Sequence, residues 1–115
     1  MNCSLTIVAQ AQLDAARETS SGRASTTVFG GHEHSLRQTV IALTGGQQLQ
    51  EHESPGEATL QVLQGRVELR AGEVRSSGST GDLLVIPDAR HSLAALEDSV
   101  ILLTVVKAAD PRQVR

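Results

Sequence analysis

The chain has four histidines whose side chains could bind a metal or anchor a polar ligand. They are His32, His34, His52 and His91. Neutral imidazole is a common protein ligand for transition metals, alone or together with carboxylates. Cys3 is the only cysteine, so neither an internal disulfide nor a thiolate zinc site is expected. The chemistry therefore depends on which histidines the fold brings together.

Composition limits the classes of partner. The chain has 115 residues, which suits one domain with a single core. Its one aromatic residue is Phe29, so the core is aliphatic and stacking surfaces for single-stranded nucleic acid are missing. The net charge is −3 without long runs of either sign, which argues for a soluble protein and against a nucleic-acid partner. We find no signal peptide and no membrane-spanning run, and we expect a cytoplasmic location.

The elements that must position the histidines are short strands. Turn signals rich in glycine, proline and serine separate runs of apolar and β-branched residues, a pattern typical of an all-β sandwich or barrel. The expected strands cover residues 26–29, 36–43, 47–53, 58–63, 67–70, 82–86 and 100–106. The last is the most apolar, so we expect it to be buried on both faces. We interpret the serine-rich run at 76–81 as part of a hairpin turn.

The two ends of the chain look different from this body. Weak alternation at residues 4–9 indicates a short strand, and the helix-favouring run at 11–18 indicates one or two helical turns that need docking. A polar stretch follows at 19–25. We therefore divide the chain into an N-terminal arm at 1–25, a β-barrel at 26–107 and a polar, frayed tail at 108–115.

Regularly spaced residues mark the stretch from Gly46 to Gly65. His52 follows Gly46 after five intervening residues, and Ser54 and Ala58 come before the closing Gly65. This spacing resembles the first motif of the cupin family, whose members are small β-barrels of jelly-roll type. The family carries a second histidine where this chain has Ser54, and a glutamate where it has Ala58.

A second stretch resembles the other cupin motif. Gly81 is followed after five residues by Pro87, then by Ala89 at a glycine position and by His91 one residue early. The resemblance covers roughly residues 36–106. It implies a single-domain, all-β cupin jelly-roll barrel with a short N-terminal arm, similar to the short RmlC-like bacterial cupins. Family members commonly pair through barrel edges, so a homodimer is also expected.

The resemblance further implies a metal site of reduced strength. In metal-binding cupins the motif histidines and glutamate converge inside the barrel on iron, manganese, nickel, copper or zinc. Carried over, only His52 and His91 remain, so the site holds a divalent ion loosely or holds none. The candidates for a third ligand are His34 and Glu57. On a regular strand Glu57 points away from the face of Ala58, unless a bulge in the preceding turn reverses it.

The other histidine pair offers an alternative motif. His32-x-His34, followed by Gln38 and Gly45, reproduces the first-motif spacing with glutamine in place of glutamate. We reject this window as the main motif, because the succession after residue 62 fits the cupin order better. We favour the interpretation that His32 and His34 lie in a solvated turn beside the glycine pair at 30–31. Under the alternative, His34 reaches the barrel and supplies a third imidazole.

These observations lead to three functional hypotheses. The preferred one is a small-molecule binding or sensing cupin whose ligand is unknown, and the alternatives are a metal-dependent dioxygenase or isomerase and a non-catalytic, dimeric regulatory module. Arg90, beside His91, is a candidate anion holder. The predicted ligand pocket contains Gln48, Ser54, Ala58, Leu60, Gln61 and Val62.

Overall fold

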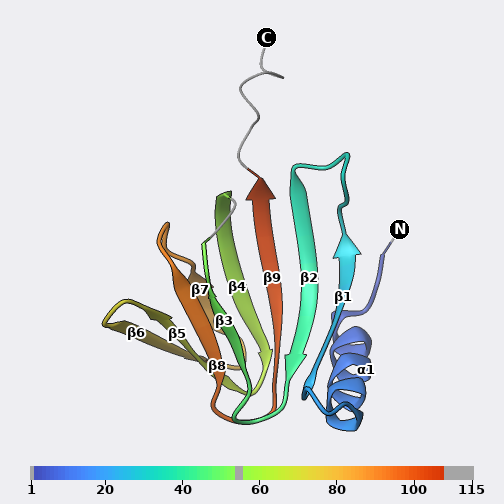
Figure 1. The fold of residues 1–115 in the computed structure, drawn as a ribbon. Coiled ribbons are helices and arrows are strands. Elements are labelled where there is room, and N and C mark those ends of the chain that lie inside the picture. Colours follow the sequence, from blue (N-terminus) through green and yellow to red (C-terminus); the bar gives the residue numbers. More distant parts are fainter. Residues whose placement is uncertain (1, 54–55, 108–115) are drawn as a thin grey trace.

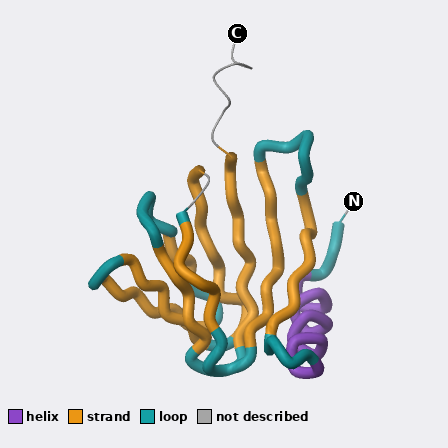
Figure 2. The backbone as a smooth tube through the Cα atoms, in the orientation of Figure 1, coloured by secondary structure: helices purple, strands orange, loops and turns teal. Residues whose placement is uncertain are grey.

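The computed structural model describes residues 2–53 and 56–107 (Figure 1). These ranges contain one helix and nine strands: α1 Leu5–Glu18, β1 Arg23–Phe29, β2 Leu36–Leu43, β3 Gln48–His52, β4 Gly56–Gln64, β5 Arg66–Ala71, β6 Val74–Ser79, β7 Leu83–Val85, β8 His91–Ala95 and β9 Ser99–Lys107. The strands form an antiparallel five-stranded sheet in the order β1-β2-β9-β4-β7 and an antiparallel four-stranded sheet in the order β3-β8-β5-β6. The predicted all-β architecture is confirmed, and Figure 2 shows how little of the described chain is helical.

β9 lies at the centre of the five-stranded sheet, between β2 and β4. Its side chains alternate between two apolar cores. Ile101 and Leu103 point between the sheets, whereas Val100 and Leu102 point to the outer face. Burial decreases along the strand, from buried at residues 99–102 to exposed at its end. The expectation of complete burial is therefore correct only for its first half.

The inner core lies between the two sheets. It is aliphatic, as the composition predicts, and both sheets contribute to it. Its buried members are Leu43, Ala58, Leu60, Val62, Val67, Leu69, Leu84, Ile86, Leu93, Ala95 and Ile101. Most of the fully buried ones lie near the end of the sandwich where β9 begins, which is the lower end in Figure 1.

The outer core is formed by α1 on the outer face of the five-stranded sheet (Figure 1). Ala9, Leu13 and Ala16 follow one another at four- and three-residue intervals, so they lie on one helix face, and all three are buried against the sheet. The hydroxyl oxygen of Ser4 caps the helix by accepting a hydrogen bond from the backbone N–H of Ile7, at 3.2 Å.

The predicted strand at 4–9 is wrong, because α1 begins at Leu5. The predicted short helix at 11–18 covers only the second part of α1. Leu5 and Ala9 fit helical spacing as well as they fit alternation, and docking against the sheet supplies the stability that an isolated 14-residue helix lacks. Among the described residues, no helix is both long and apolar enough to cross a membrane.

Two further strands differ from the expectation. The serine-rich run predicted as a turn forms most of β6, an edge strand whose side chains are nearly all exposed, so small polar residues cost little there. β8 was not predicted, although its burial alternates along its whole length. β1 begins at Arg23, inside the predicted arm. The predicted tail at 108–115 lies outside the described residues.

Asp98 connects α1 to the loops at the lower end of the sandwich. Its carboxylate accepts hydrogen bonds from the backbone N–H of Gly45 at 2.8 Å and from Nε of Arg17 at 2.9 Å. These bonds favour the charged form, and they hold the pKa of Asp98 below its ordinary value, with the Gly45 bond as the larger cause.

We expect Asp98→Asn to destabilise the fold at neutral pH by about 1 kcal/mol or less, because the carboxylate is partly exposed and its ion pair is screened. A lowered native pKa gives stability that is present above the ordinary value of 3.8 and is lost as pH falls through the native pKa. The difference from the parent should therefore shrink below about pH 4. Urea unfolding at pH 7 and pH 3 measures it, with the exposed Asp88→Asn as control. An equal loss at both pH values would contradict this prediction.

Candidate functional site

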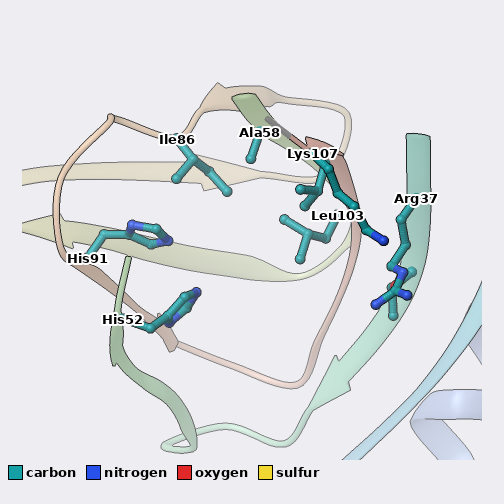
Figure 3. A pocket seen from close by; sticks show the side chains of 9 residues that line it. Arg37, His52, Ala58, Ile86, His91, Leu103 and Lys107 are labelled. Carbon is teal, nitrogen blue, oxygen red and sulfur yellow. The ribbon is translucent and has the colours of Figure 1, made fainter. Parts of the chain in front are cut away.

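His52 and His91 form the centre of the site. They lie opposite each other in the pairing of β3 with β8, after an irregularity in the register beyond Leu49. Their rings meet edge to face, with centroids 4.4 Å apart and planes at 60° (Figure 3). His91 is 3% exposed, whereas His52 is exposed at the end of its strand. The site therefore pairs one buried histidine with one exposed histidine.

Both rings are oriented by the backbone. Nδ1 of His52 lies 2.7 Å from the carbonyl oxygen of Gln50, and Nδ1 of His91 lies 2.9 Å from that of Ala89. Because a carbonyl oxygen only accepts, Nδ1 of each ring is the donor, and the neutral form of the ring then keeps a lone pair on Nε2. Metal-binding histidines use the same orienting hydrogen bond. In this state each Nε2 can accept a hydrogen bond or bind a cation.

The two imidazoles line a cavity of about 420 Å³. The cavity lies toward the end of the sandwich where β9 finishes, and its walls come from both sheets. Four of the nine lining side chains are aliphatic, and the other five are polar or charged. Its lining residues are Arg37, Thr39, His52, Ala58, Ile86, His91, Leu103, Val105 and Lys107. Apolar walls with a few polar groups are typical of small-molecule sites.

Two cationic side chains lie across the cavity from the imidazoles. Figure 3 shows Arg37 from β2 and Lys107 from β9 close to each other, with Leu103 on the way to the histidines. No acidic side chain is among the described residues that line the cavity. Within the described ranges, neither cation makes an ion pair.

The two candidates for a third ligand do not line the cavity. His34 lies in the exposed turn before β2, where its ring packs edge to face against Phe29 at 5.1 Å between centroids. Glu57 is exposed on the outer face of β4, opposite Val106. Regular alternation holds at this point, so no bulge turns Glu57 inward. Across the residues that the structure describes, no group of three His, Cys, Asp or Glu side chains could hold a metal ion.

The predicted pocket residues are divided between three environments. Ala58 lines the cavity. Leu60 and Val62 share its face but lie deeper, in the inner core. Gln48 and Gln61 are exposed, since each belongs to the opposite face of its strand. The predicted Ser54 falls in the two-residue gap of the described chain.

Sequence reasoning missed six of the nine lining residues, namely Arg37, Thr39, Ile86, Leu103, Val105 and Lys107. The signal was available in alternation along β2 and β9, because residues at odd positions share the inner face. Arg90, the predicted anion holder, instead pairs with Glu51 at 3.0 Å between Nε and Oε1.

No protein-family model matches the chain, and neither does any curated protein. Solved structures do. A cupin superfamily protein from Desulfitobacterium hafniense has a TM-score of 0.69 at 16% identity, over 75% of this chain and 78% of that one. An RmlC-like cupin from Desulfovibrio desulfuricans has a TM-score of 0.64 at 24% identity, over 73% and 81%. The chain therefore has the fold of the small bacterial cupins, as its two motifs predict.

A further structure is more similar in sequence. The conserved SPY1581 protein of unknown function from Streptococcus pyogenes is 30% identical to this chain, with a TM-score of 0.71 over 80% of both chains. Our chain belongs to the same family as this protein.

Proposed function

We propose that this protein binds a small organic molecule in the cavity between its two sheets. The observation that carries the proposal is the convergence of His52 and His91 on a cavity otherwise bounded mainly by aliphatic side chains. Its volume of about 420 Å³ lies within the range of roughly 300–1,000 Å³ that is usual for such sites. The cupin fold is compatible with this function and does not by itself establish it.

The chain's own groups suggest how a ligand would be held. His91 lines the cavity and its Nδ1 is engaged by the backbone, so its Nε2 would accept a hydrogen bond from a hydroxyl or N–H group of the ligand. His52 would contribute the same kind of acceptor on the solvent side. Ile86 and Leu103 would remove the ligand's apolar part from water.

A divalent metal fits this site only in part. His52 and His91 would hold it through Nε2, and a bound ion would polarise an oxygen of the ligand. Catalytic metal sites usually have three protein ligands, and the described residues offer two. The methyl group of Ala58 stands where the resemblance places a glutamate. The donor set therefore favours the binding hypothesis over a metal-dependent dioxygenase or isomerase.

A fragment screen by NMR tests the proposed function. We expect fragments with an apolar body and one hydrogen-bond donor to shift the backbone amides of Ala58, His91 and Leu103. Ala58→Phe should fill the cavity and abolish these shifts, because its ring would occupy the space beside the imidazoles. Thr59→Phe, on the outer face of the same strand, is the control. Binding that is absent, or that survives Ala58→Phe in a folded variant, would refute the proposal.

A further inference from the structure

We propose that the ligand of this cavity is a carboxylate with an aliphatic body, and that Arg37 and Lys107 bind its carboxylate group. The inference rests on the proposed function, because it names the ligand class of the same cavity. It depends on three features: the placement of the two cations, their lack of described acidic partners and the character of the walls between them and the imidazoles.

The sheet register places the two cations side by side. Arg37 lies opposite Val105 in the pairing of β2 with β9, and Lys107 is two residues farther along β9 on the same face. The backbone N–H of Lys107 donates to the carbonyl oxygen of Ser35 at 2.9 Å, which continues the pairing to this point. Diagonal neighbours of this kind are within reach of each other's long side chains. Figure 3 shows both reaching the same side of the cavity.

The charges of this pair are unbalanced within the described chain. Elsewhere Arg17 pairs with Asp98 and Arg70 with Glu68. By contrast, Arg37 and Lys107 line a cavity whose described walls contain no carboxylate. Two cations held close together repel each other, and an anion between them removes that repulsion. A guanidinium also binds both oxygens of a carboxylate at once, whereas a lysine supplies a point charge.

The walls of the cavity indicate the chemistry of the rest of the ligand. Ala58, Ile86, Leu103 and Val105 present aliphatic surface between the cations and the histidines. Apart from the two imidazoles, no aromatic side chain is among the described lining residues, so the walls offer no Phe, Tyr or Trp ring for stacking. At the far end, both Nε2 atoms are acceptors when the rings are neutral and Nδ1 donates to the backbone. A hydrogen-bond donor at the distal end of the aliphatic body, such as a hydroxyl group, would therefore complete the match.

Two matched probes separate the contribution of the ligand's carboxylate charge to affinity from that of burying its aliphatic body. Isothermal titration of the full chain with hexanoate and with 1-hexanol compares the same aliphatic body with and without a carboxylate. We expect hexanoate to bind at least about tenfold more tightly, which corresponds to one charge-assisted contact. Arg37→Gln and Lys107→Gln should each weaken hexanoate binding about tenfold and leave 1-hexanol binding unchanged. Arg75→Gln, an exposed arginine on β6, is the control and should change neither.

The results distinguish this inference from the proposal on which it rests. Equal affinity for the two probes at the cavity would overturn the carboxylate assignment and leave small-molecule binding in place. A preference for hexanoate that survives both glutamine variants would overturn the roles of Arg37 and Lys107. If neither probe binds while neutral fragments bind the cavity, the carboxylate class is wrong. If nothing binds the cavity, both proposals fail. Thermal unfolding of each variant verifies that it is folded.

Discussion

Replacing Gly65 with alanine is expected to lower the free energy of unfolding by about 4 kcal/mol, a large part of the roughly 5–15 kcal/mol that a domain of this kind has. Gly65 joins β4 to β5 with a φ of +92°, which side-chain-bearing residues rarely adopt. An added Cβ would also overlap the carbonyl oxygen of Asp98 and both the hydroxyl oxygen and the Cα of Ser99.

These neighbours cannot move away cheaply. Ser99 is 1% exposed at the start of β9, and its hydroxyl oxygen accepts a hydrogen bond from the backbone N–H of Arg66 at 3.1 Å. Shifting it would disturb the junction between the two sheets. Guanidinium unfolding measures the loss.

Gly81→Ala provides a matched control for this prediction. Gly81 has a φ of +93°, almost the same as Gly65, but no heavy atom lies within 4 Å of its added Cβ. Its substitution should therefore cost only the backbone strain, about 1–3 kcal/mol. The difference between the two variants isolates the steric overlap. Equal losses would show that the overlap relaxes without cost, contrary to our expectation.

Replacing Ala58 with glutamate is expected to raise the affinity for Zn²⁺ or Ni²⁺ by about a hundredfold, since it would supply the third side-chain ligand that the described site lacks. Ala58 lines the cavity with His52 and His91, whose Nε2 atoms are free to bind. The orienting hydrogen bonds of both rings are already present, so the added carboxylate completes a partly organised site.

Isothermal titration with each metal ion measures this gain. Thr59→Glu places the same carboxylate on the outer face of β4, and it should leave the affinity unchanged. Adding His52→Ala or His91→Ala to Ala58→Glu should remove most of the gain. A similar affinity for Ala58→Glu and Thr59→Glu would mean that the cavity cannot assemble three ligands.

The sequence predicts most strands well because their signals are local. β2 covers 36–43 as predicted, since an apolar, β-branched run ends at a glycine pair. The predicted length of α1 is too short, because the stability of this helix comes from docking against the sheet and not from its own sequence. β8 was missed because five residues that include small and polar side chains give a weak signal, and only the pairing with β3 and β5 makes them a strand.

The site was predictable in part, because the spacing of its motifs is also a local signal in the sequence. The motif spacing selects His52 and His91, and the structure brings their rings together. Arg37 and Lys107 carry no such spacing. A charged residue near a strand end is usually solvated, and only the register of β2 against β9 shows that these two share one inner face. Metal binding and homodimerisation stay predictions.

The decrease in burial along β9 also has an evolutionary consequence. Ser99 and Ile101 lie in tightly packed surroundings at one end, whereas Val105 and Lys107 border the cavity at the other. Substitutions at the first end should be selected against through stability, and under the proposed function those at the second end should be selected mainly through ligand binding. Under that proposal, related chains could change the ligand that they bind without losing the packing that makes them fold, and SPY1581-like proteins should differ most among the residues around the cavity.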